Sequence, residues 1–456
     1  MKYLKTLTLA AATAALGATA HAQSADAIID KLVEKGILTT KEAQDLRDEA
    51  DKNFTTALAT KTDMADWVTS LKFHGDIRGR YEMFSGDNPL FTDRQRLRYR
   101  MRFGAVATLL DNFEAGLRLS SSESASGGAN NEGDPISGNT TFQNNGSKKL
   151  LFIDQAYGKW SPLNGPNFLA SFTIGKMENP FVFSDMVFDA DYTPEGLAAQ
   201  LGYIINDNQT LRLNAGYFVL DELSASSHDS AMLGAQLRWD ANWTPKLSTS
   251  LGAAYLDISS AAYLTNSAVP NINRGNTRAA DGRLAYGYRP FVLDAAATYK
   301  LDSFPMYKGA FPIKVMADYM VNDGAPGKGN DVNGRPADNY AYTVGVQLGK
   351  SGKKGTWDLG YSYKWLGANA WYEELVDSDF GGFYALGGVT GSPFNSGSGV
   401  GYGSGTNVKG HIVRFQYSPS DSFTFTVKWL LTELISPYGP GSSEMSRLQI
   451  DGTWKF

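Results

Sequence analysis

The chain has 456 residues, with 42 lysines and arginines against 47 aspartates and glutamates and a formal net charge of −5. This net negative charge argues against a general binder of nucleic acid or other polyanions. The sequence contains no cysteine, which excludes disulfide scaffolds, cysteine nucleophiles and thiolate metal sites.

Residues 1–22 have the pattern of a secretory signal peptide. Lys2 and Lys5 form a basic start, and the apolar stretch "LTLAAATAALGATA" follows. The small-residue site "AHA" closes at Ala22, so we expect a mature chain that begins at Gln23. A buried helix is the alternative, but it explains neither the lysines nor the cleavage site. Beyond this stretch, the sequence has no apolar run of about 20 residues that would form a transmembrane helix.

The next segment, 23–70, has helical periodicity. "ADAIIDKLVEKG" carries apolar residues at helix-face spacing and stops at Gly36. A second helix is predicted from Thr39, which forms a capping box with Glu42. We interpret this segment as a periplasmic helical spacer. An element for self-association or cell-wall contact is the alternative that remains open.

From Leu71 to the end of the chain, the pattern has a period of two. In "LKFHGDIRGRYEM", Phe73 and Ile77 fall on one face and charged residues on the other. About 16 such segments have the length of tilted membrane strands. The predicted strands are 71–83, 94–108, 111–121, 150–160, 167–177, 195–204, 209–220, 230–240, 246–258, 290–301, 311–322, 339–349, 355–366, 409–419, 422–433 and 445–456. The segment 150–160 alternates poorly.

Short and long connections alternate between these segments. Tight turns such as "LLDN", "INDNQ" and "SPSD" follow the even-numbered strands. Long connections rich in Gly, Ser and Asn follow several odd-numbered ones, at 122–149, 178–194, 259–289 and 367–408. This alternation is typical of a meander barrel with plain turns on one rim and long loops on the other.

The number of strands decides which face turns outward. A barrel of about 16 strands has a lumen too wide for side chains to fill. The apolar face must therefore meet lipid, and the charged face must line a water-filled interior. We predict an all-β fold, a transmembrane antiparallel meander β-barrel over residues 71–456, preceded by the short helical segment.

The stretch "RQRLRYRMRFGAV" places an arginine at every second position from Arg94. If the first two strands form a hairpin, Glu82 faces Arg96 and Asp76 faces Arg102. The candidate pore-lining residues are Arg78, Arg80, Arg96, Arg98, Arg100, Arg102, Arg118, Asp76 and Glu82. Rings of such charges set ion preference, so the row predicts a preference for anions. The alternative is that the arginines only pair with acids and hold the wall.

Several motifs resemble the Gram-negative "putative porin" family of outer-membrane proteins. They are "IIDKLVEKGILTTKEAQDLRDEA", "LKFHGDIRGRYE", "RQRLRYRMRFG", "DQAYGKW" and "GKMENPF". The final "RLQIDGTWKF" looks like the C-terminal strand of such proteins, which assembly machinery recognises and which here ends in Phe456. The resemblance implies an outer-membrane channel for small hydrophilic solutes or ions, commonly a homotrimer, with no catalytic residues.

In general porins the third loop folds into the barrel and narrows it. The stretch "MENPFVFSDMVFDADYTPEG" stands at the matching place in the chain. The resemblance therefore makes Glu178, Asp185, Asp189 and Asp191 candidates for a constriction that faces the arginines. The loop's phenylalanines would anchor it inside.

Other classes of function have weaker support. An outer-membrane hydrolase needs a nucleophile and base, but His74, His228 and His411 are far apart and no G-x-S-x-G motif occurs in a strand–turn–helix setting. A barrel sheath for a protein partner, or an adhesin acting through long loops, remains an alternative. No cofactor, metal or nucleic acid is expected. A calcium site at Asp323, Asp331 and Asp338 is possible, but these residues have no EF-hand spacing, and a solvated loop explains them better.

Overall fold

The computed structural model describes residues 65–123, 133–224, 227–264, 275–385 and 401–456. The predicted signal peptide and residues 23–64 of the predicted helical segment lie outside these residues. The chain divides into two units, 1–71 with 107–110, and 72–106 with 111–456. The second unit holds the barrel and the loops described below. Among the described residues, no helix has the length and apolarity to cross a bilayer.

Long antiparallel strands form a closed barrel of sixteen. They are β1 (Val68–Gly86), β2 (Arg94–Leu109), β3 (Phe113–Ser121), β5 (Leu151–Asn164), β6 (Phe168–Lys176), β7 (Glu195–Asn206), β8 (Gln209–Asp221), β9 (Ser230–Asn242), β10 (Leu247–Ser259), β11 (Pro290–Leu301), β12 (Phe311–Asn322), β13 (Tyr340–Gly349), β14 (Thr356–Leu366), β17 (Val408–Ser420), β18 (Phe423–Leu434) and β19 (Met445–Lys455). Short additions are β4 (Thr140–Thr141), the hairpin of β15 (Gly381–Tyr384) and β16 (Gly401–Ser404), and the 3₁₀ turns η1 (Leu110–Asn112), η2 (Asn144–Gly146) and η3 (Ala261–Tyr263).

The last strand closes the barrel against the first. β19 pairs with β1 in an antiparallel register from Gly86↔Met445 to Asp76↔Lys455. Closure leaves no free sheet edge, as a membrane-spanning sheet requires. Each of the sixteen predicted segments coincides with one barrel strand, so the predicted fold class is confirmed. The first strand begins earlier than predicted, at Val68.

The alternation of side chains is the reverse of that in a soluble barrel. On β9, Gln236 and Arg238 are buried, whereas Leu237 between them is 48% exposed. The same contrast separates Arg98 from Leu97 on β2. The polar face therefore points inward, and the outer surface is a continuous apolar band that suits lipid.

One strand departs from strict alternation. β5 pairs with β3, and the register shifts between Arg118 and Leu119, which oppose Gln155 and Ile153. Asp154 is the extra residue at this β-bulge, and a bulge turns one side chain out of phase with its neighbours. The bulge explains why the predicted segment 150–160 alternates poorly.

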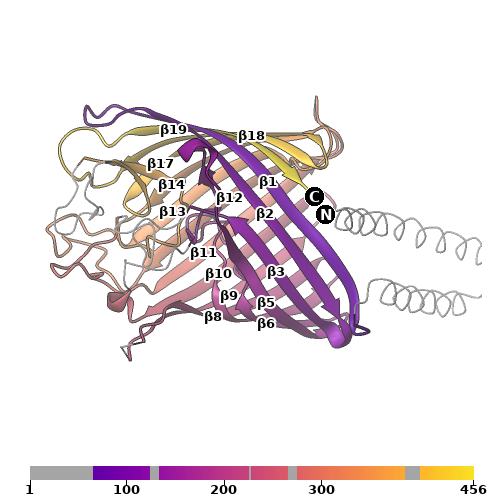
Figure 1. The fold of residues 1–456 in the computed structure, drawn as a ribbon. Helices are drawn as coiled ribbons and strands as arrows, with labels where there is room; N and C mark the ends of the chain where they lie inside the picture. Colours follow the sequence, from indigo (N-terminus) through magenta and orange to yellow (C-terminus); the bar gives the residue numbers. More distant parts are fainter. Residues whose placement is uncertain (1–64, 124–132, 225–226, 265–274, 386–400) are drawn as a thin grey trace, which may run out of the picture. The chain divides into compact units, whose positions relative to one another are not determined.

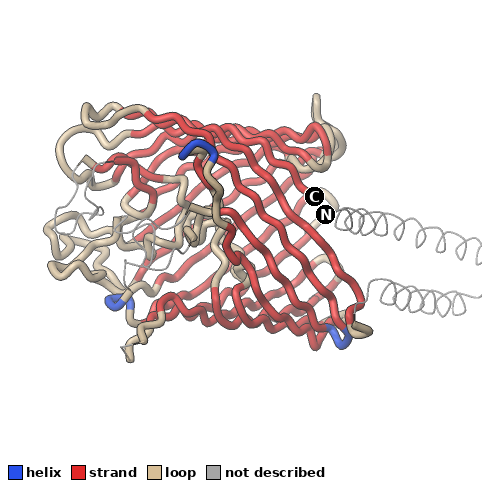
Figure 2. Tube along the Cα trace, in the orientation of Figure 1, coloured by secondary structure: helices blue, strands red, loops and turns tan. Residues whose placement is uncertain are grey.

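Most of the loop length lies at one end of the strands, as Figure 2 shows in tan. At the other end, turns are short, such as the turn between β7 and β8 at 207–208. Figure 1 shows the same division, with the strands labelled. The predicted alternation of short and long connections is therefore seen in the structure.

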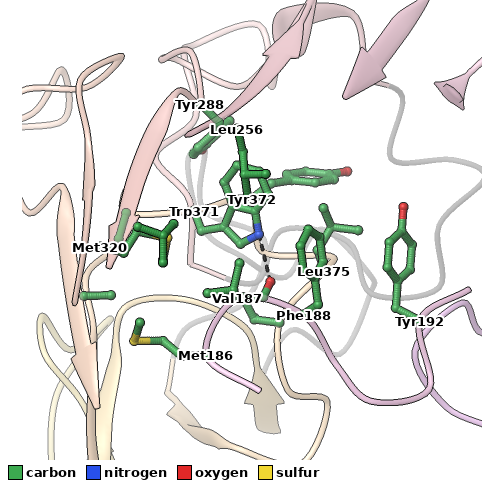
Figure 3. Packing of buried hydrophobic residues seen from close by; sticks show 14 of the residues in the cluster. Met186, Val187, Phe188, Tyr192, Leu256, Tyr288, Met320, Trp371, Tyr372 and Leu375 are labelled. Atoms are coloured by element: carbon green, nitrogen blue, oxygen red, sulfur yellow. Dashed lines mark hydrogen bonds between the residues drawn. The ribbon is translucent and has the colours of Figure 1, made fainter. Parts of the chain in front are cut away.

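Two of the long loops carry an apolar cluster that is buried within the described structure. Met186, Val187 and Phe188 come from the loop after β6, and Trp371 and Leu375 come from the loop after β14. Figure 3 shows these side chains packed together, with the Trp371 indole directed at the Val187 carbonyl. Each fully buried side chain of this size contributes about 1.5–3 kcal/mol, so the cluster holds both loops in place.

Candidate functional site

A row of arginines lies on the inward face of β2. Period-two alternation turns every second side chain of a strand to the same face. On this face lie Arg96, Arg98, Arg100 and Arg102. Arg98 and Arg100 are buried, whereas Arg94 at the start of the strand is exposed. Arginines at this spacing repel one another unless acids or anions lie between them.

Two acids of β1 supply that compensation. The Nε of Arg96 lies 2.5 Å from Oε2 of Glu82, and the Nε of Arg102 lies 2.7 Å from Oδ2 of Asp76. Arg100 shares Asp76, at 2.9 Å from Oδ1. These contacts agree with the predicted register, which set Glu82 against Arg96 and Asp76 against Arg102.

The charges continue across the closing seam onto β19. Arg447 Nη2 lies 2.7 Å from Oε1 of Glu82, and Gln449 donates to the same oxygen at 3.0 Å. Arg80 on β1 forms two hydrogen bonds with Asp451, both of 2.8 Å. We call this set the charged wall: Asp76, Arg78, Arg80, Glu82, Arg96, Arg98, Arg100, Arg102, Arg447, Gln449 and Asp451. Sequence reasoning missed Arg447, although the alternation of β19 and the closure of the barrel would have placed it here.

Arg78 and Arg118 complete the set of predicted arginines. Arg78 Nη2 donates to Oδ1 of Asn139 at 2.6 Å, and among the described residues it forms no ion pair. Arg118 on β3 pairs with Asp154 on β5, with 2.5 Å between Nε and Oδ2. Arg118 therefore extends the row of arginines by one strand, and its charge is balanced by Asp154.

Residues 177–194, the first inward loop, cross the barrel interior. Near its start, the amide N–H of Val182 donates to Gln236 on β9 at 2.9 Å. Near its end, Asp191 Oδ1 lies 2.9 Å from Arg100 Nη1 and 3.3 Å from Arg102 Nη1 on β2. Because β9 and β2 are far apart around the barrel, a loop that touches both must lie inside it.

The four predicted constriction acids have different surroundings. Asp191 pairs with the arginines of β2, as above. Asp185 pairs with the buried Lys364 of β14, at 2.6 Å from Nζ. Asp189 accepts hydrogen bonds from backbone amides, including that of Asp191 at 2.8 Å. Glu178 is exposed, and among the described residues it forms no ion pair with the charged wall.

The charges of these loop acids follow from their neighbours. Burial opposes ionisation of Asp191, but the guanidinium groups of Arg100 and Arg102 outweigh it and lower its pKa. The ammonium of Lys364 likewise lowers the pKa of Asp185 to about 2 in spite of burial. Burial and the nearby carboxylate of Asp191 raise the pKa of Asp189 well above its ordinary value. The loop therefore presents the ionised carboxylate of Asp191 to the charged wall, whereas Asp189 binds a proton more readily than an ordinary aspartate.

A second inward loop, residues 367–385, also reaches the charged wall. Asp379 Oδ1 lies 2.7 Å from Arg447 Nη2, and its Oδ2 lies 3.2 Å from Arg80 Nη1. Asp377 lies 3.4 Å from Nζ of Lys364. The predictions treated this stretch only as part of a long connection. The sequence signal that could have identified it is the acidic and aromatic stretch "EELVDSDF", in a loop otherwise rich in Gly and Ser.

Two of the histidines lie outside the charged wall. Nδ1 of His411 lies 2.9 Å from the hydroxyl of Tyr361 on the outer face. Nδ1 of His228 lies 3.5 Å from Oγ of the adjacent Ser227 in an exposed loop. Across the described ranges, no group of three His, Asp or Glu residues could hold a metal ion.

Comparisons with known proteins agree with this architecture. The model of a family described as "Putative porin" matches residues 88–286, which confirms the predicted resemblance. A search of the curated proteins found no match.

Solved structures with a similar fold are outer-membrane porins. The high pH structure of OprB from Pseudomonas putida aligns with a TM-score of 0.50 and 11% identity, over 88% of this chain and 97% of that one. Salmonella typhi OmpF in complex with daunomycin aligns with a TM-score of 0.45 and 11% identity, over 85% and 97%. A loop L8 deletion mutant of OmpT from Vibrio cholerae gives 0.44 and 10%, over 85% and 99%. At this identity, the likeness to OprB concerns the fold.

Proposed function

We propose that this chain is an outer-membrane porin, a channel for passive diffusion of small hydrophilic solutes or ions. The observation that carries the proposal is the inverted barrel, with its apolar band outside and its charged wall inside. Only a lipid environment satisfies that outer surface, and only water or ions satisfy that inner one. The match of residues 88–286 to the "Putative porin" family supports it.

We further propose that the channel prefers anions. Most guanidinium groups of the wall have acid partners, but Arg78 has only the amide oxygen of Asn139 among the described residues. Asp191 and Asp451 are near enough to attract Arg78 but form no ion pair with it among the described residues. Its positive charge is therefore less fully compensated than that of the paired arginines, and such a charge attracts mobile anions. If every arginine only held the wall together, neutralising Arg78 would change stability and leave selectivity as it was.

Reversal potentials in planar bilayers under a salt gradient test this preference. We expect the wild-type protein to be anion-selective and Arg78→Gln to lower the anion-to-cation permeability ratio by about 2- to 5-fold. Arg94→Gln is the matched control, because Arg94 is an arginine of the adjacent strand β2 that is exposed at the strand end. Equal selectivity of the two variants would overturn the anion proposal and leave the channel intact.

The same recordings, together with a hydrolysis assay, separate the channel from the alternative functions. Stepwise conductance of the purified protein supports a porin. A barrel that inserts without conducting would instead support a sheath for a partner or an adhesin. Hydrolysis of a lipid or peptide substrate by the purified protein would support the enzyme alternative.

We also propose the cellular setting that the sequence predicts: export through a signal peptide cleaved after Ala22, insertion into the outer membrane, and a homotrimer. The structure supports a role of Phe456 in assembly, because its amide and carbonyl exchange hydrogen bonds of 3.1 and 2.9 Å with Gly75 on β1. The terminal residue thus takes part in closing the barrel. Deleting Phe456 should lower the folded fraction recovered in outer membranes.

A further inference from the structure

The two inward loops carry the same sequence pattern. "DMVFDADY" at 185–192 and "EELVDSDF" at 373–380 both read acid, any residue, aliphatic, apolar, Asp, any residue, Asp, aromatic. The loops leave the sheet after β6 and after β14, which lie half way around the sixteen-stranded barrel from each other. The repeated pattern therefore approaches the interior from two opposite walls.

The first aspartate of each D-x-D triplet has the same local role. Asp189 Oδ1 accepts the amide N–H of Asp191 at 2.8 Å, and Asp377 Oδ1 accepts the amide N–H of Asp379 at 2.8 Å. Such a turn fixes the direction of the second aspartate. In both loops the second aspartate points to the charged wall.

The second aspartates bind neighbouring parts of that wall. Asp191 pairs with Arg100, whereas Asp379 pairs with Arg447 and Arg80, at the distances given above. Arg100, Arg80 and Arg447 come from three adjacent strands, β2, β1 and β19. Together the two loops contact one continuous arginine surface.

The loops also bind each other. The amide of Asp189 donates to the carbonyl of Leu375 at 2.7 Å, and the amide of Asp377 donates to the carbonyl of Asp185 at 3.1 Å. The amide of Ser378 donates to Oδ2 of Asp189 at 2.8 Å. Neither loop can leave the wall without breaking hydrogen bonds to the other.

We propose that the constriction of this channel is one clasp made by both loops, and that Asp379 determines ion selectivity together with Asp191. This inference rests on the proposed porin function. Each aspartate cancels part of the arginine charge where its loop meets the charged wall. Removing either charge strengthens the attraction for anions and loosens the clasp, and because the loops share contacts, the two changes are coupled.

Four variants measured for conductance and reversal potential test the clasp. Asp379→Asn and Asp191→Asn should each raise the anion-to-cation permeability ratio by about 2- to 5-fold, and the double variant should differ from the product of the single effects. Asp87→Asn is the control, because Asp87 is an exposed acid of the β1–β2 loop. If Asp379→Asn behaves like Asp87→Asn while Asp191→Asn shifts selectivity, the first loop alone forms the constriction. If the wild-type protein does not conduct, the porin function itself fails.

Contact between the loops can be tested without any conductance. The chain has no cysteine, so the pair Ala190→Cys and Ser378→Cys introduces the only thiols. We expect a short bifunctional thiol reagent to link them in the folded protein, seen as an internal cross-link between proteolytic fragments. Each single variant is the control. Absence of the link in a folded, heat-modifiable barrel would overturn the clasp whether or not the protein is a channel.

Discussion

The barrel wall and the inward loops are held by different kinds of interaction. The wall is a repeating ladder of hydrogen bonds between neighbouring strands, with apolar side chains outward and charged ones inward. The loops depend on a few specific contacts, such as the buried Lys364 that pairs with Asp185 and Asp377. A repeating structure tolerates the loss of one contact, whereas a structure with few contacts does not.

The largest effect that would test this contrast is expected from Lys364→Met. This change removes the cation shared by Asp185 and Asp377 while keeping an apolar stem beside Phe380, which lies 4.6 Å from Nζ. Asp377 is buried and keeps only the more distant Lys428, at 3.7 Å from Nζ, and removing one partner of a buried ion pair costs about 3–5 kcal/mol. We expect amides of the two inward loops to exchange with deuterium much faster, while those of β9 and β10 remain protected.

A second variant identifies the cause of that change. Lys364→Met combined with Asp377→Asn also removes the carboxylate that has lost its partner. This double variant should restore part of the protection of the loop amides against deuterium exchange. Faster exchange throughout the barrel strands would contradict the contrast, because it would show that wall and loops unfold as one unit.

The same contrast explains what the sequence could predict. Period-two alternation is local, so all sixteen strand segments and the pairing of Glu82 with Arg96 followed from neighbouring residues. The contact of Arg447 with Glu82 joins the two ends of the barrel and depends on the register of closure. The path of 367–385 depends on which distant groups it meets, and no local period encodes that. The bulge at Asp154 was visible only as a weakness of the pattern.

A smaller effect is expected from a charge on the outer face. Leu237 is 48% exposed on β9. On a water-soluble protein, an arginine at such a position would hardly change the free energy of folding. In a bilayer, Leu237→Arg should destabilise folding by about 2–4 kcal/mol, the cost of a cation on the lipid face. Leu237→Met is the apolar control. Urea titrations of folding into lipid vesicles would measure the difference, and equal stability of both variants would show that this face does not meet lipid.

The smallest predicted effect depends on pH and concerns a loop acid away from the clasp. Burial raises the pKa of Asp338 from 3.8 to about 6, although a hydrogen bond of 3.2 Å from Trp365 Nε1 to the carboxylate opposes the shift. Because the folded state binds this proton more tightly than the unfolded chain, the stability it contributes is complete below pH 4. It is lost as the pH rises through 6.

Asp338→Asn remains uncharged at every pH and should remove this dependence. Relative to the wild type, we expect it to be more stable by about 1–2 kcal/mol at pH 8 and nearly equal at pH 4, after allowance for residual hydration of the carboxylate. Unfolding at pH 4, 6 and 8 measures the difference, with the exposed Asp87→Asn as control. A constant difference at all three pH values would show that the carboxylate of Asp338 is already hydrated in the folded loop. The loop would then be held by its backbone contacts, such as the 2.8 Å bond from the amide of Asn369 to the carbonyl of Asp338.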